Sequence, residues 1–231
     1  MKNTAGTLVR LAFAALGLIA AARRLSAQDF TIHMKMDDGS DGTTYYVSPD
    51  AIRRVTPGAT DVIDRIDRGT IIYLDHRTKT YKEGSVAEAH DAIARAMDST
   101  NLDPQRQAML HRIGMDKPPE FTKIGPGENI AGYPTDKYSF KSGMAQGEMW
   151  VTQALQFPAA YYRDFNLLAG VATPFGDMGK IAQVHGIILK RKMTMALGRG
   201  TTASETAVSI EKGPIPASMF EPPAGYTKVA R

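Results

Sequence analysis

The sequence predicts an α+β domain in which an antiparallel sheet is interrupted by helical segments. Short extended runs separated by Gly and Pro fill most of the chain, as in the stretch from Phe121 to Thr152. Helical spacing of apolar residues appears only between such blocks. The turns between consecutive runs are tight, and tight turns join antiparallel strands because parallel strands need long crossovers.

The N-terminal segment has the features of a secretory signal peptide. Lys2 and Arg10 precede a short apolar run from Leu11 to Ala22, which is well below the roughly 20 residues needed to span a bilayer. Leu25-Ser26-Ala27 can serve as the cleavage site, and cleavage after Ala22 is the alternative. We therefore expect a periplasmic or secreted protein with no stable membrane insertion after cleavage.

Removal of residues 1–27 leaves 28–231 as one domain and changes the charge balance. The full chain has 28 basic and 24 acidic residues, and four of the basic ones lie before residue 28. The remaining chain is neutral, so it lacks the basic surface expected for binding nucleic acid. No Cys is present, which excludes disulfides and a lipid-modified cysteine anchor.

Alternation predicts the first strand, and a meander follows it. Phe30, Ile32, Met34 and Met36 alternate with polar residues, as expected for a half-buried strand. Further β runs separated by tight turns extend to residue 82. This block predicts three or four antiparallel neighbours in sequence order.

Two groups of aspartates have simpler explanations than metal binding. A calcium loop starting at Asp37 needs Glu at its twelfth position, where Ser48 stands. The second group lies among arginines, so we expect charge pairs across strands. Its members and their expected partners are Asp61, Asp64, Asp67, Arg65, Arg68 and Arg77.

Two helices are predicted between the β blocks. Ser85 with Glu88 three residues later forms a capping-box pattern at the start of an amphipathic segment. A second helix begins after Asp103-Pro104. We expect this pair to pack on a face of the sheet.

An aromatic and aliphatic stripe marks a third helical segment. Phe157, Tyr161, Phe165 and Leu168 recur at spacings of four, four and three. This stripe is either core-facing or lines an apolar ligand cavity, because such cavities are mostly hydrophobic with aromatic walls.

The last β block shows clear alternation. One face is predicted to carry an apolar row interrupted only by Arg191, and residues alternate between the two faces in the run after Gly200 as well. The apolar row comprises Ile187, Leu189, Met193, Met195 and Leu197, followed by Thr206, Val208 and Ile210 in the next run. Met adapts to irregular apolar partners, so the Met-rich strands fit either a core or a binding surface.

The common catalytic motifs are absent from the sequence. It has no cysteine nucleophile, Gly-x-Ser-x-Gly elbow, His-Glu-x-x-His helix or phosphate-binding Gly-rich loop. None of the five histidines has a second one four residues away. We therefore expect no enzyme activity, no cofactor and no metal.

Four segments of the chain carry a family resemblance: Thr70 to Tyr81, Asn129 to Tyr138, Gly147 to Val151 and Gly213 to Tyr226. They resemble segments of secreted bacterial proteins of an uncharacterised family that is similar to periplasmic lipoprotein carriers of the LolA/LolB type. The resemblance implies a strongly curved, unclosed antiparallel half-barrel whose concave face is covered by helices, and a cavity that holds acyl chains.

Two functions follow from the resemblance and the apolar patterns. The first is non-enzymatic binding of a lipid, a lipoprotein acyl chain or another apolar ligand in the half-barrel. The candidate cavity residues are Met149, Trp150, Phe157, Tyr161, Phe165, Leu168, Met193 and Met195. The alternative is a structural, sensing or protein-interaction module of the cell envelope, with a protein partner and no small ligand.

Overall fold

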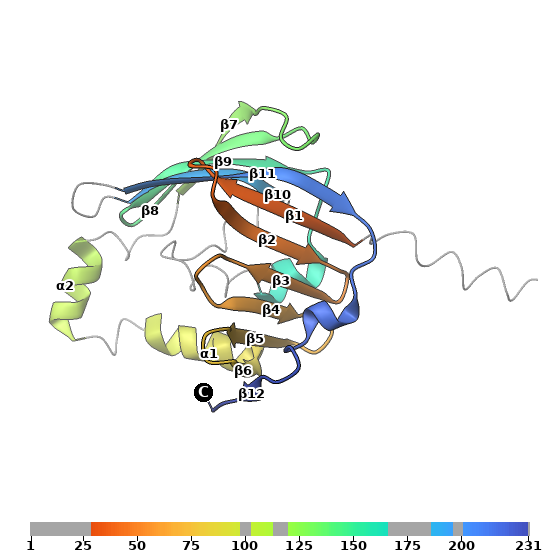
Figure 1. Cartoon of the computed structure of the whole chain (residues 1–231). Helices are drawn as coiled ribbons and strands as arrows, with labels where there is room; N and C mark the ends of the chain where they lie inside the picture. Colours follow the sequence, from red (N-terminus) through yellow and green to blue (C-terminus); the bar gives the residue numbers. More distant parts are fainter. Residues whose placement is uncertain (1–28, 98–102, 113–119, 166–185, 196–200, 231) are drawn as a thin grey trace, which may run out of the picture.

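The computed structural model describes residues 29–97, 103–112, 120–165, 186–195 and 201–230 (Figure 1). The predicted signal peptide, Leu168 and Leu197 lie outside these ranges. The strands are β1 (Phe30–Met36), β2 (Asp41–Val47), β3 (Ala51–Val55), β4 (Asp61–Arg65), β5 (Thr70–Asp75), β6 (Thr80–Ser85), β7 (Glu120–Pro126), β8 (Asp136–Ser142), β9 (Ala145–Thr152), β10 (Ile187–Met195), β11 (Thr201–Lys212) and β12 (Thr227–Lys228). The helices are α1 (Val86–Met97), α2 (Pro104–Arg112), the π-helical turn η2 (Tyr161–Phe165) and the 3-10 turn η4 (Ala217–Phe220).

The strands form one curved, unclosed sheet of 12 strands. Its order is β12-β6-β5-β4-β3-β2-β1-β11-β10-β9-β8-β7, with β7 and β12 at the two edges. All neighbours pair antiparallel except β12, which adds to β6 in parallel. The prediction of an antiparallel sheet interrupted by helices is confirmed.

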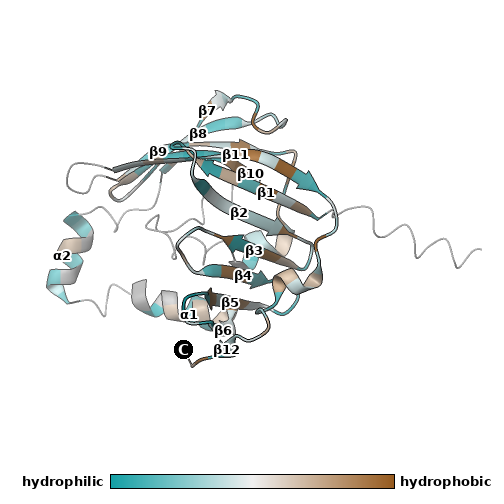
Figure 2. Ribbon diagram, viewed as in Figure 1, coloured by the Kyte–Doolittle hydropathy of each residue, from teal (hydrophilic) through white to brown (hydrophobic). Residues whose placement is uncertain are grey.

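Along strands such as β1, alternate residues are buried, so one face of the strand packs against the core. Along β1, Phe30, Ile32 and Met34 are buried while the residues between them are half-exposed. Figure 2 shows hydrophobic residues along the strands and a more hydrophilic α2. Gly147 permits the close pairing of β9 with β10, because a Cβ at this position would lie 1.9 Å from the Lys192 carbonyl oxygen.

The two predicted helices differ in their contact with the sheet. The capping box of α1 is present, since the Glu88 amide donates to Ser85 Oγ at 3.1 Å and the Ser85 amide to Glu88 Oε2 at 3.2 Å. Val86 and Ala89 of α1 join the main core. By contrast, each α2 side chain whose burial is described is exposed, including Met109 at 59%. Packing of both helices on the concave face is therefore not confirmed.

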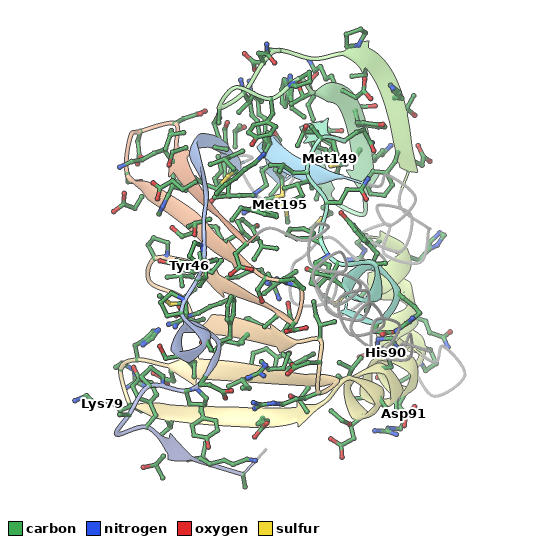
Figure 3. The ribbon with its side chains drawn as sticks, turned by 90° about the vertical axis from the view of Figure 1, so that its right-hand side faces the viewer. Tyr46, Lys79, His90, Asp91, Met149 and Met195 are labelled. Atoms are coloured by element: carbon green, nitrogen blue, oxygen red, sulfur yellow. The ribbon has the colours of Figure 1, made fainter. Side chains whose placement is uncertain are left out.

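The sheet has two faces that are covered by different parts of the chain. Figure 3 shows η2 and α1 on one side of the sheet and the C-terminal tail with η4 on the other, while β12 extends the sheet at its edge beside β6. We call these the inner and outer faces. On the outer face, Phe220 of the tail packs into a cluster with Ala51, Ile63, Ile72 and Leu74.

The prediction of one continuous apolar row along the last β block is wrong. The β9–β10 register shifts between Ile188 and Lys190, so Ile187 and Leu189 join the main core while Met193 and Met195 pack in a separate cluster. Pairing of β1 with β11 also skips Val208, which is 55% exposed. Bulges of this kind interrupt the alternation that the sequence pattern assumes.

Candidate functional site

Two features share the inner face of the sheet. One is an apolar patch on β7–β10, which we call the methionine wall: Phe121, Tyr138, Phe140, Ala145, Met149, Val151, Ile188, Met193 and Met195. The other is a set of four charged residues, which we call the inner ion cluster: Arg54, Asp64, Arg191 and Glu205.

Strand register places Arg191 at the border of these two features. Arg191 lies directly opposite Met149 on β9 and directly opposite Glu205 on β11. Residues in such cross-strand positions project from the same face of a sheet. Met193 and Met195 follow at two-residue steps, so they also project from the face that carries Arg191.

Arg54 lies in the other half of the sheet, opposite Tyr45 in the β2–β3 pair. Three strands separate β3 from β10 in the curved sheet. Burial lowers the pKa of Arg191, but Tyr45 and the ion pair with Glu205 outweigh burial, so the net shift of this pKa is upward. The positive charge of Arg54 opposes the upward shift to a smaller extent.

Glu205 holds Arg191 in place. Its Oε2 lies 2.7 Å from an Arg191 terminal nitrogen, and its Oε1 accepts a hydrogen bond from the Thr43 amide. The Glu205 side chain is only 4% exposed, whereas that of Arg191 is 38% exposed. Gly42 makes this possible, because a Cβ there would lie 2.6 Å from Glu205 Oε1.

Arg54 and Asp64 form a looser pair. The nearest guanidinium nitrogen of Arg54 lies 3.5 Å from Asp64 Oδ2, well beyond the usual 2.7–2.9 Å of a charge-assisted hydrogen bond. Arg54 Nε is buried and has no hydrogen-bond partner in the part of the chain that the structure describes. Burial raises the pKa of Asp64, and the attraction of Arg54 offsets that rise only in part.

Aromatic rings from η2 and the segment before it lie beside this cluster. The Phe157 ring lies 6.4 Å from that of Tyr45 and 4.8 Å from that of Tyr161. The Tyr162 hydroxyl accepts from the Phe157 amide and donates to the Gly186 carbonyl, which fixes the segment. Burial raises the pKa of Tyr161, so its phenol stays neutral at ordinary pH.

The eight predicted cavity residues do not gather in one place. Met149, Met193 and Met195 belong to the methionine wall, while Phe157 and Tyr161 lie in the main core near Tyr45. Trp150 also belongs to the main core cluster, but it projects from the face opposite to Met149, with Lys137 at 4.9 Å and Lys190 at 4.7 Å from its ring. The side chain of Phe165 and all of Leu168 lie outside the described residues.

A separate hollow of about 520 Å³ lies at the rim of the sheet. Phe157 is the one predicted cavity residue among those that line it, together with Phe30, Val47, Leu155 and Lys212. The methionine wall and the inner ion cluster do not contribute to this hollow.

The expected charge pairs are present, in part with the predicted partners. Asp67 pairs with Arg65 at 2.7 Å and with Arg68 at 3.8 Å, as predicted. Asp61 and Asp64 of β4 instead pair with Arg53, at 2.6 Å, and Arg54 of the neighbouring strand β3. Within the described ranges, no group of three or more His, Asp or Glu residues has a metal-binding arrangement.

Sequence reasoning missed the inner ion cluster. The interruption of an apolar row by Arg191 was the visible signal, because a charge on a buried face needs a partner. The partner Glu205 lies 14 positions later and is brought opposite only by the β10–β11 register.

Comparison with known proteins assigns the chain to a family. Residues 29–226 match a family model described as "Domain of unknown function (DUF4412)". The chain belongs to this family. No curated protein matches the sequence of this DUF4412 protein. The resemblance to LolA/LolB carriers is not confirmed by these comparisons.

Two solved structures show weak similarity to this DUF4412 chain. The structure of PNGF-II is 12% identical with a TM-score of 0.36, covering 88% of this chain and 31% of that one. The structure of MucB is 14% identical with a TM-score of 0.37, covering 93% and 64%. The chain thus spans less than two thirds of either structure, and neither TM-score supports an inference about function. No helix in the described part of the chain is long and apolar enough to cross a membrane.

Proposed function

We propose that this protein binds a lipid or another apolar ligand along the inner face of its sheet, without catalysing a reaction. The observation that carries this proposal is the methionine wall, whose members Phe121, Met193 and Met195 remain only partly buried. An apolar face on the inside of an unclosed, curved sheet has the concave shape that small-molecule sites need.

The chemistry of the wall supports a flexible apolar ligand. Methionine side chains are unbranched and polarisable, so they adapt to ligands of irregular shape. Burying apolar surface contributes about 25 cal/mol per Å², so an acyl chain that covers this wall gains several kcal/mol. The predicted signal peptide agrees with a role in the periplasm or outside the cell, where lipids and lipoprotein acyl chains need carriers.

The test is native mass spectrometry of the purified protein, compared with a denaturing spectrum after organic extraction. We expect an apolar species that is released only on denaturation. Met193→Glu should abolish this species, because a carboxylate would lie in the wall, whereas Met193→Leu should retain it. Val208→Glu is the matched control, since Val208 is an exposed apolar residue on the neighbouring strand.

Two results would overturn the proposal. One is a protein that carries no apolar species and, after delipidation, takes up no fluorescent apolar dye. The other is equal ligand retention by folded Met193→Glu and Val208→Glu variants, which would show that the wall is only core.

A second candidate is a protein-interaction module that uses the edge strand β7. This strand ends the sheet, and its Ile124 is 56% exposed. An edge strand offers backbone groups to which a partner strand can add. Site-specific photo-crosslinking from Thr122 in cell-envelope extracts tests this candidate: one stoichiometric protein adduct would favour it, and the absence of an adduct would exclude the edge.

A further inference from the structure

We propose that the ligand carries an anionic head group, a carboxylate or a phosphate, which binds between Arg54 and Arg191 while its apolar chain lies on the methionine wall. This inference rests on the proposed binding function and names the class of ligand. Apolar binding as proposed above uses only the methionine wall and gives no role to the inner ion cluster that borders it.

The first argument is position. Arg191 lies opposite Met149 and two residues before Met193, so the charged group stands at the border of the apolar patch. A chain that covers the wall and extends toward β11 brings its end to the Arg191 guanidinium. An amphiphile with one charged end matches this order of apolar and cationic surface.

The second argument is incomplete neutralisation. Arg54 meets its carboxylate at only 3.5 Å, and its buried Nε has no partner among the described residues. A buried donor without a partner costs about 1–3 kcal/mol, more when the group is charged. An anion bound beside Arg54 would recover part of this free-energy cost. An arginine in a close structural ion pair would have no such cost left to recover.

The third argument is orientation and access. Glu205 occupies one edge of the Arg191 guanidinium and is itself fixed by the Thr43 amide. A guanidinium has five N–H donors in a planar fork that suits carboxylates and phosphates. Because the side chain is 38% exposed, the remaining donors of Arg191 are accessible to a ligand.

The charge of Asp64 supports the same conclusion. Its pKa is raised because burial disfavours the carboxylate more than Arg54 stabilises it. Burial lowers the pKa of Arg54, but the charge of Asp64 offsets burial and the net shift is upward. The cluster thus holds two guanidinium groups and two carboxylates, and one of these carboxylates, Asp64, meets its arginine only at 3.5 Å.

The experiment is isothermal titration calorimetry on the delipidated full chain with three probes that share one apolar chain. The probes are oleic acid, oleyl phosphate and oleyl alcohol, each used below its micelle concentration. We expect the two anions to bind about 10- to 100-fold more tightly than the alcohol, since a hydrogen bond to a charged group contributes about 1.5–3 kcal/mol. The stronger of the two anions identifies the head group as carboxylate or phosphate.

Substitutions at Arg191 separate a ligand contact from a structural role. Arg191→Gln should lower the affinity for the two anions about 10- to 100-fold more than the affinity for oleyl alcohol, while Arg191→Lys should retain part of the preference for the anions. Lys192→Gln is the matched control, because Lys192 is the next residue on β10, is exposed and projects from the opposite face. Arg54→Gln should reduce the preference for the anions without abolishing it.

The outcomes distinguish this inference from the proposed function. Equal affinity for all three probes overturns the anion subsite and leaves apolar binding standing. An equal loss of all three probes in Arg191→Gln, with the urea midpoint lowered, assigns the cluster a structural role and also overturns the subsite. If none of the three probes binds the wild-type chain, both proposals are wrong.

Discussion

Arginines at consecutive positions of β3 have very different surroundings on the two faces of the sheet. On the outer face, Arg53 donates to Asp61 from two nitrogens at 2.6 and 3.2 Å and to the Met219 carbonyl at 3.1 Å. On the inner face, Arg54 has one contact of 3.5 Å to Asp64 and an Nε without a partner within the described residues. All three guanidinium nitrogens of Arg53 thus have hydrogen-bond acceptors within the protein, whereas Arg54 has one long contact to Asp64 among the described residues.

The C-terminal tail is the cause of this difference. It supplies Met219 to Arg53 and Glu221 to Arg65 and Arg68. It also supplies Tyr226, whose hydroxyl lies 2.6 Å from His76 Nδ1, while His76 Nε2 lies 2.9 Å from Asp61. The charges of the outer face thus receive partners from the tail, whereas the pair of Arg54 and Asp64 on the inner face receives none from the described residues of the tail.

The largest expected effect comes from breaking the attachment of the tail to the outer face. Phe220 is 5% exposed and packs against Ile63, Ile72 and Leu74. Phe220→Ala should lower the free energy of unfolding by about 3–5 kcal/mol, because it removes apolar burial and leaves a cavity. Urea denaturation measures the effect. Met109→Ala, at a residue 59% exposed, should change stability by less than about 0.5 kcal/mol. Equal effects of the two substitutions would show that the tail does not stabilise the sheet.

Replacing both members of each ion pair tests the comparison directly. The inner double variant Arg54→Met/Asp64→Leu should be neutral or more stable by about 1–4 kcal/mol, since a poorly matched buried pair does not recover its desolvation cost. The outer double variant Arg53→Met/Asp61→Leu should lose about 1–3 kcal/mol, because the Met219 carbonyl and His76 lose their partners. Urea unfolding of both variants gives the comparison, and the same sign of change in both would contradict it.

The two faces also predict opposite responses to pH. The pKa of Asp64 is raised above 3.8, so the folded state holds this proton more tightly than the unfolded state does. Between 3.8 and the raised pKa, stability therefore falls as the pH increases. Asp64→Asn removes this titration, so its stability relative to wild type should improve between pH 3.5 and 7. A relative stability that stays constant or declines over this range would exclude a raised pKa.

The sequence predicted the strands and the first helix well, because those features depend on local patterns. Alternation over 30–36 and the capping box of Ser85 and Glu88 needed no information from distant residues. The faces of the later strands depended on bulges between Ile188 and Lys190 and at Val208, which only pairing reveals. Met149 and Trp150 are adjacent on a strand, so their side chains project from opposite faces of the sheet, as strand geometry requires.

The candidate site was predictable only in part for the same reason. The methionines of β9 and β10 were identified as apolar candidates, and the structure brings three of them into one wall. Arg54 and Arg191 are 137 positions apart, and only the strand order and curvature of the sheet place them on the two sides of one face. No local pattern encodes that curvature, so the polar half of the site emerges only from the fold.

The smallest expected effect concerns the exposed end of the outer ion network. The Glu221 side chain pairs with Arg65 and Arg68 and is 39% exposed. Burial raises its pKa, but hydrogen bonds from the two arginines outweigh burial and hold the pKa below 4.5. Because the folded pKa is lowered, this stabilisation is present above pH 4.5 and disappears as the pH falls through the folded value.

Glu221→Gln should therefore cost less than about 1 kcal/mol at pH 7, as solvent screens an exposed pair. The difference in stability between this variant and wild type should become smaller in acid and with added salt. The effect of Asp64→Asn should change little with salt, because the Asp64 side chain that it replaces is only 3% exposed. Urea midpoints at pH 3.5 and 7, each with and without 1 M NaCl, measure both variants. If the stability lost in Glu221→Gln did not depend on salt, the ion pairs of Glu221 with Arg65 and Arg68 would behave like buried pairs. The contrast with the buried Asp64 would then not hold.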